Sequence, residues 1–130
     1  MLSKSFFLID DDQDDHEILI AALQEIDNSI VCHSALTGED GLNKLDSQAF
    51  RPDLIFLDLN MPGMNGFDVL KEIKRSIRLK NIPVVIFSTS NNPKDIKETE
   101  SLGAHTFITK PSQYADLREI LKAVLKSIFY

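Results

Sequence analysis

The sequence predicts an α/β fold, a doubly wound parallel sheet of five strands with helices on both faces. Five short apolar segments alternate along the 130 residues with five segments whose apolar positions recur at helical spacing. The short segments are continuously apolar, which is typical of parallel strands covered on both faces. Right-handed crossovers between such strands produce the doubly wound arrangement.

The first half of the chain predicts two strands and two helices. Residues 5–9 (SFFLI) form a buried strand that stops abruptly at Asp10. A helix over 14–27 follows, because its apolar residues recur every three or four positions. These residues are Ile18, Leu19, Ala22, Leu23 and Ile26. Residues 29–34 (SIVCHS) are predicted as a second strand and 38–48 as a helix.

The second half repeats this alternation. Residues 53–57 (DLIFL) predict a buried strand, and the turn-rich 60–66 leads into a helix. That helix is built on Phe67, Val69, Leu70 and Ile73. Residues 83–87 predict the fourth strand, and a helix over 93–102 follows. Ser90 is its expected N-cap, and Gly103 is placed to end it.

The C-terminal part completes the pattern with a short strand over 106–109 (TFIT) and the strongest helical stripe of the chain. The stripe consists of Leu117, Ile120, Leu121, Val124, Leu125 and Ile128. Ordinary core packing and a partner or homodimer surface explain it equally well. The helix over 93–102 has only Ile96 and Leu102 as large apolar anchors, so we expect it to move easily.

Composition excludes several classes of protein. There are 14 Lys and Arg against 20 Asp and Glu, a net charge of -6, which argues against nonspecific nucleic-acid binding. The single cysteine, Cys32, excludes an internal disulfide framework and a metal-binding cysteine pair. Apolar runs are far too short to span a membrane, and no signal peptide is evident. We therefore expect one cytoplasmic domain over 1–130, without a separate output or catalytic domain.

Polar side chains follow four of the predicted strands directly. Asp10 and Asp11 follow the first strand, Asp58 the third, Ser88 the fourth and Lys110 the fifth. Parallel strands bring their carboxyl ends to one edge of the sheet, where open α/β sheets bind ligands. Clustered carboxylates suit Mg²⁺, and a carboxylate can attack phosphorus as a nucleophile. A lysine and a hydroxyl would contact the phosphoryl oxygens. The residues thus predict a Mg²⁺-assisted phosphoryl-transfer site.

Four segments in this order resemble the receiver domain of bacterial two-component response regulators. They are FFLIDDD (6–12), LIFLDLNMPGMNGFDVL (54–70), IPVVIFSTS (82–90) and GAHTFITKP (103–111). The tandem acids are similar to those of phytochrome-associated and chemotaxis-type stand-alone regulators. The resemblance implies a flavodoxin-like sheet with strand order 2-1-3-4-5.

The resemblance also implies a role for each residue of the site. Asp58 is the phosphoacceptor. Asp11 is a direct Mg²⁺ ligand and Asp10 a ligand through water, while Asp58 and the Asn60 carbonyl complete the metal site.

Ser88 and Lys110 contact the phosphoryl group, so both join Asp58 in the catalytic set. Ser88 and Phe107 are the switch residues, and the Lys110–Pro111 bond is expected to be cis. Ser88 stands where threonine is commoner and Phe107 where tyrosine is frequent, so a phenolic hydrogen bond cannot report the switched state.

The implied function is a stand-alone regulator that accepts a phosphoryl group from a histidine kinase or a phosphotransfer protein. It catalyses only its own phosphorylation and dephosphorylation, so it is not an enzyme in the ordinary sense. Without an output domain it signals by binding a downstream protein, which the sequence does not identify.

Two alternatives stand beside this function. A haloacid-dehalogenase-like phosphatase would use FLIDDDQ as its nucleophile motif, but it needs an acidic pair after the lysine, and only isolated Asp116 and Glu119 follow. A receiver fold could also act as an interaction module without phosphorylation. Among the remaining acids, Asp14, Asp15 and Glu17 are explained as well by a solvated helix N-terminus.

Overall fold

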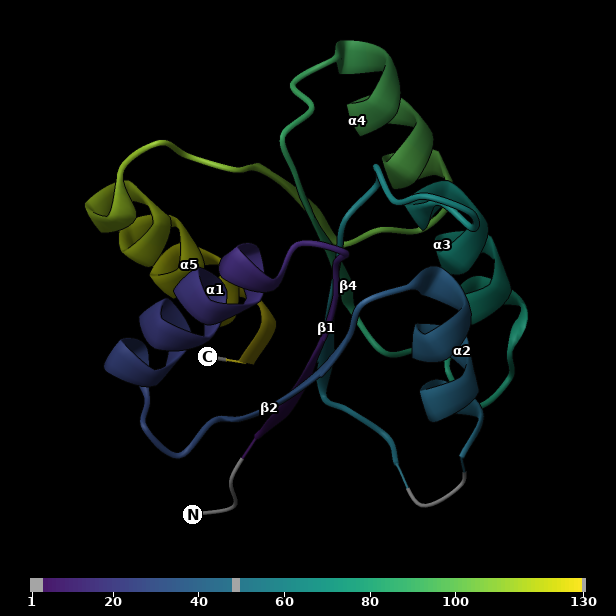
Figure 1. The fold of residues 1–130 in the computed structure, drawn as a ribbon, viewed down its shortest axis with the longest axis horizontal. Helices are drawn as coiled ribbons and strands as arrows, with labels where there is room; N and C mark the ends of the chain where they lie inside the picture. Colours follow the sequence, from purple (N-terminus) through teal and green to yellow (C-terminus); the bar gives the residue numbers. More distant parts are fainter. Residues whose placement is uncertain (1–3, 48–49, 130) are drawn as a thin grey trace.

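The computed structural model describes residues 4–47 and 50–129, in which five strands and five helices alternate (Figure 1). In chain order they are β1 (Ser5–Ile9), α1 (Gln13–Ile26), β2 (Val31–Ala35), α2 (Gly38–Asp46), β3 (Leu54–Leu57), α3 (Gly66–Arg75), β4 (Val84–Ser88), α4 (Pro93–Ser101), β5 (Thr106–Thr109) and α5 (Tyr114–Phe129). All strand pairs are parallel, in the order β2-β1-β3-β4-β5. The predicted fold class and strand order are confirmed.

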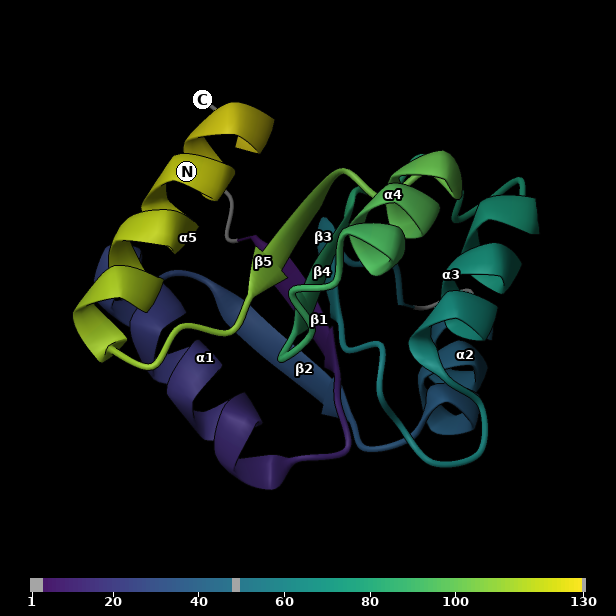
Figure 2. The ribbon, with the colours of Figure 1, turned by 90° about the horizontal axis from the view of Figure 1, so that it is seen from above.

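The helices cover the sheet in two layers. Helices α1 and α5 lie side by side on one face, and α2, α3 and α4 lie on the other (Figures 1 and 2). Successive side chains of a strand point to opposite faces, so each strand contributes to two cores. In β3, for example, Phe56 faces α1 and α5 whereas Ile55 and Leu57 face α2 and α3.

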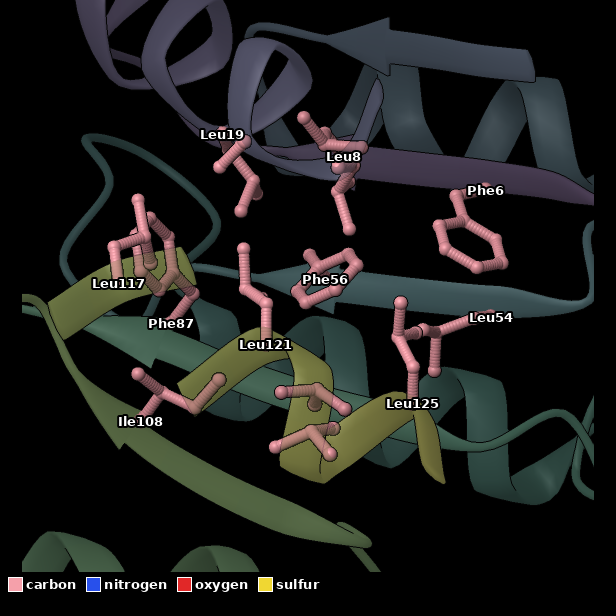
Figure 3. Close-up of a cluster of buried hydrophobic side chains, with 14 of the residues drawn as sticks. Phe6, Leu8, Leu19, Leu54, Phe56, Phe87, Ile108, Leu117, Leu121 and Leu125 are labelled. Atoms are coloured by element: carbon pink, nitrogen blue, oxygen red, sulfur yellow. The ribbon is translucent and has the colours of Figure 1, made fainter. Parts of the chain in front are cut away.

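The core under α1 and α5 is built around aromatic and leucine side chains. Phe56 lies between Leu8 of β1 and Leu121 of α5 (Figure 3). The stripe of the last helix is mostly core, because Leu117, Leu121, Val124 and Leu125 are buried. Ile120 is exposed and Ile128 packs at the edge of the core. A homodimer through α5 stays a prediction.

The element boundaries differ slightly from the sequence prediction. Strand β2 begins two residues later than expected, at Val31, and ends at Ala35. Ser90 is not the N-cap of α4, contrary to our expectation. Asn92 occupies that position, where its side chain accepts a hydrogen bond from the Lys94 N–H at 2.9 Å. Pro93 fits the first turn that follows, because this turn needs no N–H donor from it.

The segment between β3 and α3 approaches the strand end very closely. A Cβ atom on Gly66 would lie 2.2 Å from the backbone oxygen of Asp58, so no larger residue fits without a backbone shift. The Gly66 N–H donates to the Leu59 carbonyl at 3.0 Å. Gly63 has a φ of 73°, which favours glycine. Helix α3 is thereby fixed directly against the end of β3.

Two further findings concern the chain as described. The described residues contain no cis peptide bond, so the expected cis bond between Lys110 and Pro111 is a wrong prediction. The trans form is the lower-energy state of an X–Pro bond. Within residues 4–47 and 50–129, no helix has the length and apolar character needed to cross a membrane.

Candidate functional site

Four strands deliver polar side chains to the carboxyl edge of the sheet. Asp10 follows β1, Asp58 follows β3, Ser88 ends β4 and Lys110 follows β5. Backbone hydrogen bonds hold these positions together. The Asp58 N–H donates to the Ile9 carbonyl at 3.0 Å, and the Lys110 N–H donates to the Ser88 carbonyl at 2.7 Å. The side chains gather because each follows a buried strand in parallel register.

Three carboxylates form the acidic part of this site. Asp10, Asp11 and Asp58 each present an oxygen within 4.8 Å of the other two. Asp10 and Asp58 are only 6% and 5% exposed, whereas Asp11 is exposed. An all-oxygen set of this kind fits a hard divalent cation, which would offset the repulsion between the carboxylates.

Burial dominates the electrostatics of the two inner carboxylates. It raises the pKa of Asp58 to about 6, despite the opposing effect of Lys110 and of the backbone N–H groups of Asn60 and Leu59. Burial likewise raises the pKa of Asp10, against hydrogen bonds from the Asp12 N–H and from Lys110. Burial therefore disfavours the charged form of both carboxyls, and a bound cation would stabilise that form.

Lys110 is the cation at the centre of the site. Its Nζ lies 2.6 Å from Asp15 Oδ2, 3.0 Å from Asp10 Oδ2 and 3.9 Å from Asp58 Oδ2. It also lies over the ring of Phe87, 5.3 Å from the centroid. Burial alone would lower the pKa of Lys110, but the hydrogen bonds to Asp15 and Asp10 outweigh it and raise this pKa.

Ser88 is completely buried at the end of β4. Its Oγ accepts a hydrogen bond from the Ser90 N–H at 3.3 Å, and Thr109 Oγ1 donates to the Ser90 carbonyl at 2.9 Å. The ends of β4 and β5 are thus tied together beside the carboxylates. The hydrogen bond from the Ser90 N–H also links Ser88 to the segment that leads into α4.

The other two predicted residues lie at the margins. Asn60 is exposed in the loop after β3, two residues beyond Asp58. Phe107 is half-buried on β5 and packs against the core on the α2–α4 face. Together with Ile96 and Thr99 of α4 it lines a surface cavity of about 220 Å³. Phe107 is therefore near α4 rather than part of the charged cluster.

Sequence reasoning missed two residues of the site, Asp15 and His16. Asp15 makes the shortest contact to Lys110, although a solvated helix N-terminus explained it equally well. The signal was its place in the first turn of a helix, because side chains there point back towards the preceding strand end. His16 is buried, and its Nε2 lies 2.6 Å from the Asp10 carbonyl oxygen, so it anchors α1 to that strand end.

Known proteins are similar to this chain in sequence and in fold. A family model for the response regulator receiver domain matches residues 6–122. Two-component response regulator ORR4 of Oryza sativa subsp. indica is 43% identical over 81 residues, which cover 62% of this chain and 35% of that protein. Response regulator Rcp1 of Synechocystis sp. is 31% identical over 129 residues, covering 93% of this chain and 86% of Rcp1.

Solved structures agree with these matches. The phosphorylated cyanobacterial phytochrome response regulator RcpA superposes with a TM-score of 0.87 and 34% identity, covering 97% of this chain and 94% of RcpA. The Mn(2+)-bound form of Rcp1 gives a TM-score of 0.84 and 30% identity, covering 95% and 92% of the two chains. The chain spans about a third of the length of ORR4, so this relative bears on the receiver portion alone.

Proposed function

Because the chain belongs to the response regulator receiver family, we propose that Asp58 accepts a phosphoryl group from a histidine kinase or a phosphotransfer protein. The observation that carries this proposal is the surroundings of Asp58. Its buried carboxylate lies 3.9 Å from the Lys110 ammonium, at the edge where the Ser88 hydroxyl at the end of β4 and the two carboxylates that follow β1 also gather.

In the proposed reaction, an Asp58 carboxylate oxygen attacks the phosphorus of a phosphohistidine. A new O–P bond forms while the N–P bond of the donor breaks, and the released imidazole nitrogen keeps the electron pair and takes up a proton. Lys110 and Ser88 donate hydrogen bonds to the phosphoryl oxygens. Acceleration comes from positioning and from charge neutralisation, as expected for phosphoryl transfer.

We assign the metal site to Asp10, Asp11 and Asp58, with the Asn60 carbonyl as a further ligand. Bound Mg²⁺ would supply positive charge to the phosphoryl oxygens. The oxygen-only donor set and the poor solvation of Asp10 and Asp58 support this assignment, and the Mn(2+)-bound form of Rcp1 is in line with it.

The proposed output is phosphorylation-dependent binding of a downstream protein. A phosphoryl group on Asp58 would draw Ser88 and Lys110 towards it, and the ends of β4 and β5 would follow. Helix α4 follows β4 in the chain, and Phe107 lies on β5. Helix α4 buries only one side chain, Thr99. This makes the α4–β5 surface the part of the molecule that the charge change would alter first.

The experiment is intact mass spectrometry after incubation with a small phosphodonor such as acetyl phosphate, with Mg²⁺ or with excess chelator. We expect one added phosphoryl group in the wild type, and none in Asp58→Asn or in the presence of chelator. Asp14→Asn is the matched control, since Asp14 is an exposed acid of the same region.

Three other results would each contradict the proposal. Phosphorylation of Asp58→Asn would place the acceptor elsewhere. A folded, Mg²⁺-binding wild type that stays unmodified by acetyl phosphate and by phosphorylated partner proteins would favour an interaction module that works without phosphorylation. Turnover of a phosphate ester that depends on Asp10 rather than Asp58 would revive the phosphatase alternative.

A further inference from the structure

We propose that Asp15 is a positioning residue that holds Lys110 away from Asp58 in the resting protein, so that a phosphoryl group on Asp58 must compete with Asp15 for this lysine. The inference rests on the proposed function and assigns Asp15 a part in it. Asp15 lies outside the three-carboxylate cluster that could hold a metal ion, which leaves it available to Lys110.

The distances show how unevenly Lys110 is shared. Its Nζ donates to Asp15 Oδ2 at 2.6 Å and to Asp10 Oδ2 at 3.0 Å. The distance to Asp58 Oδ2 is 3.9 Å, which is too long for a hydrogen bond. Of Asp10, Asp15 and Asp58, the proposed phosphoacceptor Asp58 is therefore the one that receives no hydrogen bond from Lys110. Because the Lys110 side chain is only 12% exposed, water competes weakly for these donors.

The position of Asp15 is fixed by the start of α1. Asp12 caps this helix, its side chain accepting the Asp14 N–H at 2.9 Å. One residue beyond Asp15, the buried His16 contacts the Asp10 carbonyl oxygen at 2.6 Å. The first turn of α1 is thus attached at both sides of Asp15, which keeps its carboxylate next to the site. Asp14, in the same turn, is exposed.

This arrangement predicts opposite effects on cations and anions. Without the Asp15 carboxylate, Lys110 would shift towards Asp10 and Asp58. Its charge would then oppose a metal ion bound there and favour an anion attached to Asp58. A general loss of negative charge near the site would also weaken cation binding and strengthen anion binding. The test must therefore show that the effect depends on Lys110.

The experiment is calorimetric titration with Mg²⁺ alone, followed by beryllofluoride, an analogue of the acyl phosphate, at saturating Mg²⁺. For Asp15→Asn we expect about fivefold weaker Mg²⁺ binding and about fivefold tighter beryllofluoride binding, in the range typical of coupled sites. Asp14→Asn, which removes the same charge from the same turn, should change either affinity less than about twofold, as expected for a solvated charge. Asp15→Ala repeats the test without an amide.

A double-mutant cycle separates positioning from a simple charge effect. In a Lys110→Met background, which removes the charge but keeps an unbranched side chain, Asp15→Asn should change Mg²⁺ affinity no more than Asp14→Asn does. An undiminished effect in that background, or equal effects of Asp15→Asn and Asp14→Asn in the wild type, would overturn the role of Asp15 and leave the proposed function of Asp58 untouched. A wild type that binds no beryllofluoride and forms no phosphoaspartate would overturn the proposed function, and this inference with it.

Discussion

Helices α4 and α5 lie on opposite faces of the sheet near the same edge strand, β5, but they are attached very differently (Figure 2). Helix α5 buries four apolar side chains, of which Leu117, Leu121 and Leu125 are labelled in Figure 3, and it packs along α1 (Figure 1). Helix α4 buries a single side chain, Thr99, whose hydroxyl is satisfied by the carbonyls of Asp95 and Ile96 within its own helix. Ile96, its large apolar residue, is 37% exposed.

The contrast teaches which part of the receiver can respond to a charge change. Burial of an apolar side chain contributes roughly 1.5–3 kcal/mol, so four of them hold α5 to the rest of the fold. Nothing comparable holds α4, whose N-terminal side leads directly from Ser88 through Ser90. A small rearrangement at the site therefore costs little free energy when α4 moves to accommodate it. It costs much more when α5 has to move.

The largest expected effect comes from the better-attached helix. Leu121→Ala should lower the free energy of unfolding by about 3 kcal/mol, because Leu121 is fully buried and a cavity remains. The matched substitution in α4, Ile96→Ala, should cost less than about 1 kcal/mol, since its side chain is partly solvated already. Urea unfolding of both variants measures the difference. Equal losses would show that α4 is as firmly attached as α5.

The next largest expected effect is a change in the free energy of unfolding that comes from the charge of Asp58 and depends on pH. Burial raises the pKa of this carboxyl to about 6, above its value in the unfolded chain, so the native state holds its proton more tightly. Stability from this group is present at low pH and is lost as pH rises towards 6. Asp58→Asn should therefore stabilise the metal-free protein by about 2 kcal/mol at pH 7 and hardly at all near pH 4.

Hydrogen exchange of the same variant extends the comparison between the helices. Amides of α5 that exchange only through global unfolding should gain protection in Asp58→Asn at pH 7, whereas amides of α4 that open locally should gain little. Saturating Mg²⁺ should abolish the advantage of the variant in urea unfolding, because the cation stabilises the wild-type anion. An advantage that is independent of pH would contradict the role of burial.

The sequence was informative wherever a buried strand ends in a polar residue. Asp10, Asp58, Ser88 and Lys110 could be placed together because parallel strands have only one carboxyl edge. Asp15 could not be placed, since an acid in the first turn of a helix serves the helix dipole equally well.

Other features escaped prediction for equally physical reasons. Strand β2 is an edge strand whose Val31 is 47% exposed, so its apolar pattern is weak and its bounds shifted. The burial of Thr99 could not be predicted, because the hydrogen bonds from its hydroxyl to carbonyls of its own helix, which make burial possible, are not evident from a sequence. The Lys110–Pro111 isomer was inferred from family resemblance, and either isomer is accessible to an X–Pro bond.

The smallest expected effect concerns the start of α4. Ser90 Oγ donates to Asp95 Oδ2 at 2.6 Å and accepts the Asn92 N–H at 3.2 Å, which links the loop after β4 to the first turn of the helix. Ser90→Ala should lower the opening free energy of α4 amides by about 1 kcal/mol, a roughly fivefold faster exchange, and leave α5 amides unchanged.

Ser127→Ala is a suitable control for this last measurement. Ser127 Oγ likewise takes part in local hydrogen bonding, donating to the Val124 carbonyl at 2.7 Å, but it lies near the end of α5. We expect it to leave α4 exchange unaffected. If Ser90→Ala instead slowed exchange in α5 and α4 alike, or accelerated both, the two helices would open as one unit, and the response that we propose for phosphorylation of Asp58 could not be confined to α4 and β5.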